Sequence, residues 1–231
     1  MITVHHLERS RSQRVLWLLE ELELPYEIVR YKRNPKTLLA PPELAAIHPL
    51  GKSPVVTCDN QTVAESGAIL EFLVERFGEG RFVPAVGTPE HLRYRYFMHY
   101  AEGSLMPPLL VKLLCTRVRS APVPFFVKPI ARKIADGVGA QFVDPNLRRH
   151  VAFLEAELAR STWLAGEELT AADVQMSYPL EALLERSGEL DMTKIRAFVE
   201  RAKARPAYQR ALAKGGPVFP VTEARSTAPR S

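Results

Sequence analysis

The stretch HPLGKSPVV at residues 48–56 tells most about the fold of this chain. Its last two residues, Val55 and Val56, begin a β-branched run that predicts a strand. Pro54 stands immediately before that strand, where a cis Ser53–Pro54 bond would turn the chain and expose the backbone of Ser53. Exposed peptide groups of this kind can pair with an extended ligand. We therefore expect a ligand-binding turn at the start of a strand.

Strands and helices alternate on both sides of this turn. Alternating or β-branched runs predict strands at 2–7, 26–31, 55–57 and 61–63. Apolar residues at helical spacing predict one helix from Ser12 toward Pro25 and another over 67–77, which Gly78 ends. The order strand, helix, strand, linker, strand, strand, helix indicates an α/β domain.

The composition changes after Gly78, where glycine and proline punctuate a stretch without periodicity and no convincing strand follows. We place a first domain at 1–79, a linker at 80–88 and an all-helical second domain at 89–231, with a loose tail from about residue 215. Within the helical part, Thr170 and Asp173 have the spacing of a capping box at the start of a helix.

Size and charge exclude several classes of protein. With 231 residues, of which 46% are hydrophobic and 25% charged, the chain can bury genuine cores, so it is not mainly disordered. The net charge of +5 is too small and too dispersed to indicate nucleic acid, but it suits acidic small molecules. No apolar stretch reaches the roughly 18 residues of a membrane span, and no signal-peptide pattern is present. We expect a cytoplasmic protein that binds neither nucleic acid nor membrane.

Metal and nucleotide motifs are absent from the sequence. Cys58 and Cys115 are far apart, unlike the cysteines of dithiol redox proteins or zinc ribbons, and the six histidines form no metal-binding motif. The residues GKS at 51–53 resemble the end of a phosphate-binding loop, but Ala46 stands where that loop needs a glycine. No GxGxxG is present either. We expect neither a metal nor a nucleotide.

Two further pairs of residues complete a candidate site. Ser10 and Ser12 lie between the first strand and the first helix, where free N–H groups and the positive helix end favour an anion such as a thiolate. Before the third helix, Ser66 can cap the helix while neighbouring N–H groups take a carboxylate and Glu65 takes an ammonium. Together with the turn at Ser53, these groups could hold a zwitterionic thiol peptide.

These stretches, taken together, resemble the glutathione transferase superfamily. The resemblance is carried by SRSQRVLWLLEEL at 10–22, HPLGKSPVV at 48–56, ESGAILEFL at 65–73 and LTAADVQMSYPLEAL at 169–183. It implies an α/β thioredoxin-like N-terminal domain, an all-α C-terminal domain, glutathione as cosubstrate and usually a homodimer.

The resemblance also assigns the thiol-activating residue. Ser10 lies four positions before Arg14, which is the spacing of the activating serine in the theta and delta classes. Its hydroxyl would donate a hydrogen bond to the glutathione sulfur. Ser10 is favoured over Ser12, but both stay catalytic candidates, because either serine could instead cap the helix.

The glutathione-binding residues follow from the same resemblance. Pro54 matches the family's cis-proline, and the backbone of Ser53 would pair with the cysteinyl unit. Lys52 would meet the glycyl carboxylate, although an exposed lysine can also be simply solvated. Glu65 and Ser66 match the acid–serine pair for the γ-glutamyl end, with helix capping as the alternative.

The acceptor site is expected between the domains, at the start of the helical part. The candidates there are Tyr96, His99, Tyr100 and Met106, any of which could be an ordinary core or interface residue. Residues 112–133 carry basic side chains without one acid, and they could attract anionic substrates, line a dimer cleft or form a solvated face.

The resemblance implies a glutathione transferase that activates the glutathione thiolate to conjugate hydrophobic electrophiles, or to reduce peroxides or disulfides. The alternative is a noncatalytic glutathione-binding or protein-interaction module on the same fold. A cysteine-based glutathione-dependent reductase ranks last, because neither Cys58 nor Cys115 lies near the first helix.

Overall fold

The structure is a computed structural model of the chain that describes residues 1–37, 39–187 and 189–219. Most of the predicted loose tail, residues 220–231, lies outside the described residues. The elements of the first part are β1 Ile2–Leu7, α1 Ser12–Glu21, β2 Tyr26–Tyr31, α2 Glu43–Ile47, β3 Val55–Cys58, β4 Gln61–Ala64 and α3 Ser66–Phe77.

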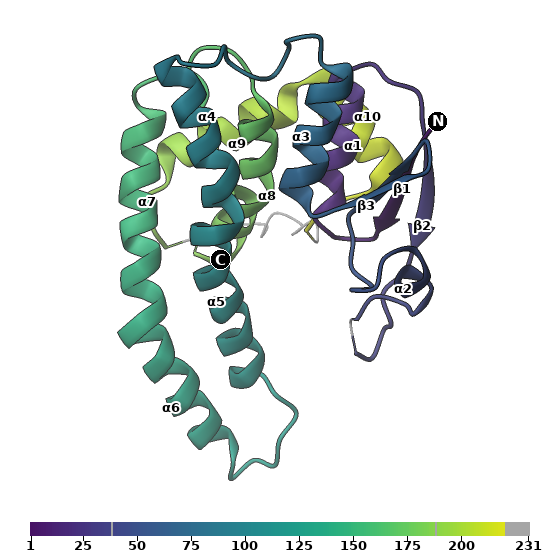
Figure 1. Cartoon of the computed structure of the whole chain (residues 1–231). Coiled ribbons are helices and arrows are strands. Elements are labelled where there is room, and N and C mark those ends of the chain that lie inside the picture. Colours follow the sequence, from purple (N-terminus) through teal and green to yellow (C-terminus); the bar gives the residue numbers. More distant parts are fainter. Residues whose placement is uncertain (38, 188, 220–231) are drawn as a thin grey trace, which may run out of the picture.

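These elements form a four-stranded mixed sheet covered by helices (Figure 1). The strand order is β2-β1-β3-β4, with β1 parallel to β2 and antiparallel to β3, and β3 antiparallel to β4. Helices α1 and α3 pack against each other and against the sheet. The predicted strands and both predicted helices are confirmed. Sequence analysis missed only the short helix α2, which follows a proline-rich stretch without helical periodicity.

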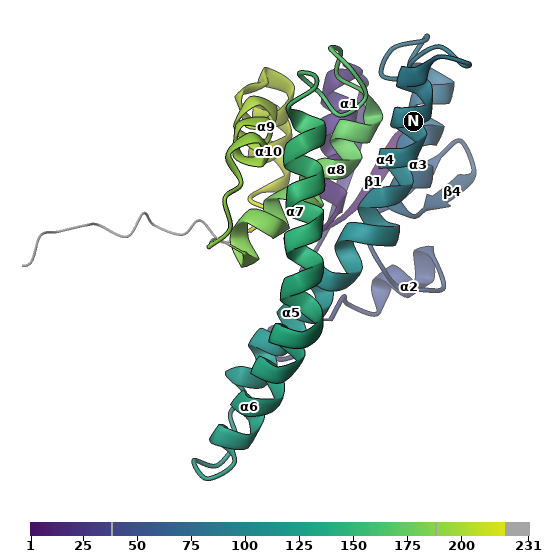
Figure 2. The same ribbon diagram turned by 90° about the vertical axis from the view of Figure 1, so that its left-hand side faces the viewer.

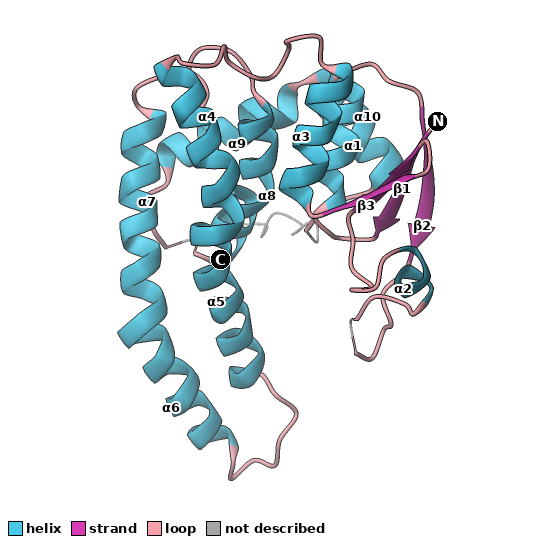
Figure 3. Cartoon of the chain, in the orientation of Figure 1, coloured by secondary structure: helices cyan, strands magenta, loops and turns pink. Residues whose placement is uncertain are grey.

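The rest of the described chain is helical (Figure 3). Its elements are α4 Pro89–Tyr100, the π-helical turn η1 Ala101–Leu105, α5 Met106–Arg119, α6 Lys128–Val138, the π-helical turn η2 Gly139–Val143, α7 Asp144–Leu158, α8 Ala171–Arg186, α9 Thr193–Ala204 and α10 Pro206–Gly215. The expected fold class, an α/β thioredoxin-like part followed by an all-helical part, is confirmed. The exact domain limits at residues 79 and 89 stay a prediction.

Helices α5 and α6 project together beyond the rest of the molecule (Figures 1 and 2). The base of α5 packs against η1 and α8. None of the helices in the described part of the chain combines the length and the apolar character that crossing a bilayer requires.

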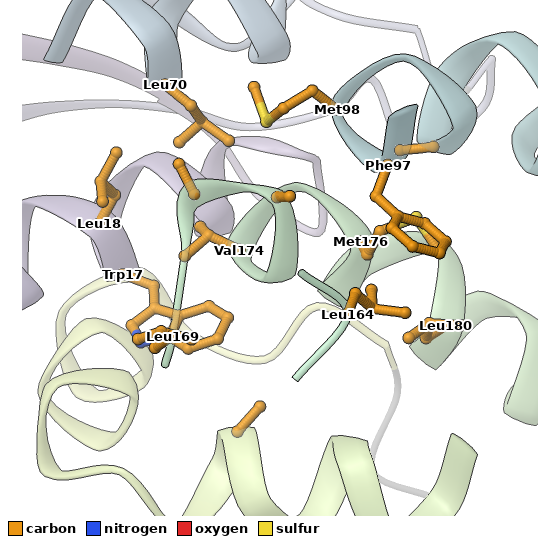
Figure 4. Packing of buried hydrophobic residues seen from close by; sticks show 14 of the residues in the cluster. Trp17, Leu18, Leu70, Phe97, Met98, Leu164, Leu169, Val174, Met176 and Leu180 are labelled. Atoms are coloured by element: carbon orange, nitrogen blue, oxygen red, sulfur yellow. The ribbon is translucent and has the colours of Figure 1, made fainter. Parts of the chain in front are cut away.

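Helix α8 lies at the centre of a core that both parts of the chain share (Figure 4). Val174, Met176 and Leu180 of α8 are fully buried among residues of α1, α3 and α4. The predicted capping box at its start is present. Asp173, which is completely buried, accepts hydrogen bonds at Oδ2 from the backbone N–H and the hydroxyl of Thr170, both at 2.8 Å.

The last helix, α10, returns to the first part of the chain and packs along α1. The ring of Tyr208 meets that of Trp17 edge-on, with centroids 5.2 Å apart. Arg210 and Lys214 donate to the carboxylate of Glu20 at 2.8 and 2.5 Å. Burial opposes ionisation of Glu20, but hydrogen bonds from Lys214, Tyr26 and Arg210 outweigh burial and lower its pKa to about 2. The sheet and α1 are therefore completed by the C-terminal end of the described chain.

Candidate active site

The turn before β3 has the geometry that its sequence predicts. The Ser53–Pro54 peptide bond is cis. The hydroxyl of Ser53 donates to the carbonyl of His5 at 2.9 Å and accepts the N–H of Leu7 at 3.2 Å. These two bonds fasten the turn to β1. The side chain of Ser53 therefore has a positioning role that sequence analysis did not assign to it.

At the start of α3, Glu65 has an unusual backbone conformation, with φ of 71° and ψ of 126°. A non-glycine residue rarely adopts positive φ, and such strain persists only where the surroundings impose it. The side chain of Glu65 is exposed. The expectation that Ser66 caps α3 is wrong, because Ser66 is the first helical residue and no side-chain cap is present. Its buried hydroxyl accepts a hydrogen bond from Arg14 at 2.8 Å instead.

A cavity of about 230 Å³ lies between the turn before β3 and the start of α3. We call it the first cavity. It brings together all five residues that the family resemblance assigns to glutathione, namely Lys52, Ser53, Pro54, Glu65 and Ser66. Its lining also includes Arg11, His48 and Glu102, which sequence analysis did not assign. The lining thus combines carboxylates, cations and exposed peptide groups.

Arg14 connects this cavity to the helical part of the chain. Its side chain is 1% exposed. It donates to Ser66 Oγ, to Glu102 Oε1 at 2.7 Å and to the carbonyl of Gln175 at 2.7 Å. Arg11 also donates to Glu102, at 3.0 and 3.2 Å. Burial opposes ionisation of Glu102, but the positive charges of Arg14 and Arg11 prevail and lower its pKa. A charged pair therefore crosses the boundary between the two parts.

Ser10 and Ser12 belong to one buried chain of hydrogen bonds. Burial lowers the pKa of His6, which favours the neutral ring. Its Nε2 lies 2.9 Å from the carbonyl of Gly215, so Nε2 carries the proton and Nδ1 accepts. Ser12 then donates to Nδ1 at 2.8 Å and accepts from Ser10 at 2.7 Å. The hydroxyl proton of Ser12 is therefore held by His6. Ser10 is the last donor of the chain, and its proton is held by Ser12 alone.

Neither serine is part of the first cavity's lining, but Arg11 between them is. Both hydroxyls are buried, with Ser10 5% exposed and Ser12 fully enclosed. No side chain caps α1, whose N-cap is Arg11. The Oγ of Ser10 accepts the N–H of Ser12 at 3.2 Å, which holds the loop in shape. Ser10 is therefore the sequence neighbour of a residue that lines the first cavity, and its hydroxyl is hydrogen-bonded to Ser12.

A second cavity, of about 690 Å³, adjoins the first at Arg11, which lines both. Its walls come from α5, α8 and the loops that follow β1, β2 and α10. Met106, one of the four acceptor candidates, lines it together with Leu110 and Leu113. Tyr178 of α8 contributes an aromatic wall. Apolar side chains thus extend the site beyond the first cavity.

The other three acceptor candidates do not line the second cavity. The rings of Tyr96 and Tyr100 lie against Phe153 of α7, with centroids 6.0 and 5.5 Å away. The hydroxyl of Tyr100 is hydrogen-bonded to His150. His99 is exposed. Helix α4 directs these tyrosines toward α7, and sequence spacing alone does not show to which neighbour a helix face turns.

Comparison with known proteins identifies the family of this chain. The family model of the glutathione S-transferase N-terminal domain matches residues 10–76, and that of the C-terminal domain matches residues 128–206. Glutathione S-transferase 1 of Saccharomyces cerevisiae is 36% identical over 193 residues, which cover 80% of this chain and 82% of the relative. The chain belongs to the glutathione S-transferase family. Glutathione S-transferase 3 of Schizosaccharomyces pombe is 38% identical over 183 residues, or 79% of this chain and 74% of the relative.

A solved glutathione S-transferase structure agrees with these matches. The crystal structure of a glutathione S-transferase from Actinobacillus pleuropneumoniae is 35% identical to this chain and has a TM-score of 0.75. The match covers 93% of both chains. In this glutathione S-transferase, the described residues contain no group of three or more His, Cys, Asp and Glu side chains that could hold a metal ion.

Proposed function

We propose that this glutathione S-transferase binds glutathione in the first cavity and activates its thiol for attack on an electrophile held in the second. One observation carries the proposal. The five residues that the family resemblance assigns to glutathione line a single cavity, and that cavity meets a larger, partly apolar one at Arg11. Catalysis requires the two reacting molecules to be held side by side, and two adjoining cavities provide this arrangement.

Each part of glutathione finds a chemically suitable group in the first cavity. The γ-glutamyl carboxylate meets the hydroxyl of Ser66 and the N–H groups at the start of α3, while the ammonium meets Glu65. The hydroxyl of Ser66 is free to donate, because Arg14 uses its oxygen only as an acceptor. The cysteinyl unit pairs with the backbone of Ser53, and the glycyl carboxylate meets Lys52. The thiol then points toward Arg11 and the second cavity.

Ser10 activates the thiol in this proposal. Only the thiolate is a strong nucleophile, so a lower thiol pKa raises the reactive fraction at neutral pH. The hydroxyl proton of Ser10 turns from Ser12 toward the sulfur and stabilises its negative charge. Ser12 cannot do the same without withdrawing its proton from His6, which would leave a buried ring nitrogen unpaired.

Glutathione binding should depend on Glu65. We expect Glu65→Ala to weaken binding about 10- to 150-fold, because a charge-assisted hydrogen bond carries about 1.5–3 kcal/mol. Isothermal titration calorimetry measures the affinity. Glu75→Ala is the matched control, since Glu75 is exposed on α3 and does not line the cavity. Equal affinity of Glu65→Ala and the wild type would show that the γ-glutamyl end binds elsewhere.

The bound thiol should titrate at higher pH in Ser10→Ala. We expect its pKa to rise by about one to two units, because the lost hydrogen bond favours the ionised sulfur by about 1.5–3 kcal/mol. Affinity for glutathione should stay nearly unchanged and turnover at pH 7 should fall. Thiolate absorbance measured against pH gives the result. If the thiol pKa changes only in Ser12→Ala, Ser12 is the residue that activates the thiol. If it changes in neither variant, the N-terminal end of α1 activates the thiol without a serine hydroxyl.

The noncatalytic alternative predicts binding without turnover. A panel of halogenated aromatics, epoxides, peroxides and mixed disulfides, assayed with glutathione, distinguishes the two functions and also separates conjugation from reduction. A homodimer and a cytoplasmic location are proposed from the family resemblance. Light scattering of the purified protein measures the oligomeric state.

A further inference from the structure

We infer that the second cavity selects acceptors that carry a carboxylate or a comparable anionic group on a flat electrophilic body. The inference rests on the proposed function and names its substrate class. Among the residues that the structure describes, five arginines line the cavity, and the only acid in this lining is Glu185. The arginines are Arg9, Arg11, Arg33, Arg117 and Arg186. These positive charges would not contribute to the binding of neutral, apolar electrophiles.

The positive charge is only partly neutralised within the protein. Arg11 is paired with Glu102. Arg186 instead has neutral partners, since it donates to the carbonyl of Leu109 at 3.2 Å and lies over the ring of Phe219 at 6.0 Å. Within the described ranges, Arg117 is exposed and has no carboxylate partner. Two guanidinium groups from α5 and α8 are therefore available to an anion in the same cavity.

The guanidinium groups are close enough to repel one another. Burial is the main cause that lowers the pKa of Arg186. The positive charges of Arg11 and Arg117 act in the same direction, against the opposing effects of Tyr178 and Glu185. An anion bound among them relieves this repulsion and forms charge-assisted hydrogen bonds. The planar fork of arginine matches a carboxylate in particular.

The apolar lining explains why the anion should be attached to a flat body. Met106, Leu110 and Leu113 form one side of the cavity and Tyr178 another. Arg11 lies over the Tyr178 ring at 5.4 Å and extends the wall toward the first cavity. An acceptor with its anion at Arg117 and Arg186 can therefore lie along this surface with its electrophilic carbon toward the thiol.

A matched pair of substrates tests the inference. 4-Chloro-3,5-dinitrobenzoate carries the anion, and its methyl ester is the neutral counterpart. In both reactions the thiolate sulfur bonds to the ring carbon that bears chlorine, and chloride leaves with the electrons of the C–Cl bond. The thiol proton passes to solvent. Dividing kcat/KM by the uncatalysed rate constant of each compound with glutathione removes their intrinsic difference in reactivity.

We expect the normalised kcat/KM to favour the benzoate by at least about tenfold, which corresponds to one charge-assisted hydrogen bond. Arg117→Gln and Arg186→Gln should each lower the normalised kcat/KM of the benzoate much more than that of the ester, and so remove most of the preference. Arg132→Gln, on exposed α6 outside both cavities, is the control and should change neither substrate. Added salt should reduce the preference. Equal normalised rates for the two substrates, or equal losses for both in Arg117→Gln, would overturn the inference.

Failure of the proposed function is distinguishable from failure of this inference. If neither substrate is turned over, calorimetry with unreactive 3,5-dinitrobenzoate and its methyl ester still measures selection by the cavity. Binding of the benzoate that weakens in Arg117→Gln supports an anion-selective cavity in a noncatalytic protein. No preference for the benzoate over the ester contradicts the inference whatever the catalytic result.

Discussion

Arg14→Leu should lower the free energy of unfolding by about 3–5 kcal/mol, because removal of one partner of a buried ion pair leaves the other unsatisfied. The substitution removes donors from Ser66, from Glu102 and from the carbonyl of Gln175, all of which are wholly or partly buried. Urea denaturation followed by circular dichroism measures the loss. Glutathione affinity should fall too, because Ser66 loses the bond that orients its hydroxyl.

Two further variants test whether geometry or charge matters at this position. Arg14→Lys keeps the positive charge, but its single ammonium group cannot bond all three partners of the planar guanidinium. Its free energy of unfolding should therefore lie between those of Arg14→Leu and the wild type. Arg95→Leu, on the exposed surface of α4, controls for loss of an arginine. If Arg14→Leu is within about 1 kcal/mol of the wild type, the link between the two parts contributes little to stability.

Asp173→Ala should cost about 3 kcal/mol or more of unfolding free energy. Its carboxylate accepts from the N–H and hydroxyl of Thr170 and from the N–H of Leu164, each at 2.8 Å. Without it, two buried N–H groups lose their partner, at about 1–3 kcal/mol each. Thermal and urea unfolding measure the change. Asp136→Ala, at an exposed acid of α6, is the control. A loss below about 1 kcal/mol would show that water replaces the carboxylate.

The same carboxylate should make stability depend on pH. Burial raises the pKa of Asp173 to about 6, against the effect of its hydrogen bonds. The folded state therefore binds the proton more tightly than the unfolded state, whose carboxyl titrates near pH 3.8. Between these values stability falls as pH rises. The side chain of Asp173→Asn does not titrate. Relative to this variant, the free energy of unfolding of the wild type should rise by roughly 1 kcal/mol as the pH is lowered from 7 to 5. A difference between the two proteins that is flat over this range would contradict the raised pKa.

Local sequence signals identified residues that the fold brings together around the first cavity, and there is a physical reason for this. The turn at Ser53–Pro54 comes just before β3, and the pair Glu65–Ser66 comes just after β4. Val55 pairs with Ala64 in the β3–β4 hairpin, so both segments lie together at its open end. The expected cis bond at Ser53–Pro54, directly before β3, is present. Residues whose placement depends on local backbone geometry were therefore predictable.

Residues whose role depends on tertiary contacts were not predictable in this way. Arg14 meets Glu102 across 88 residues of sequence, and no pattern within either segment indicates the pair. Tyr96 and Tyr100 are aromatic residues of the kind expected in an acceptor site. In the structure, however, they pack against Phe153 of α7. Arg11 lies where the two cavities meet. Its position directly after Ser10 was the one feature of the sequence that could have indicated this role.

The return of α10 to α1 has a consequence for synthesis on the ribosome. Trp17 packs against Tyr208, which is synthesised 191 residues later. At a synthesis rate of about 5–20 residues per second, this delay is roughly 10–40 s. During that time the α10-facing side of α1 has no native cover in the nascent chain, and it offers apolar surface to chaperones. Gly215 allows the late closure to be tight, since an added Cβ would lie 2.6 Å from Leu16 Cδ1. Limited proteolysis of ribosome-stalled chains that end before or after residues 206–215 should show α1 becoming protected only in the longer chains.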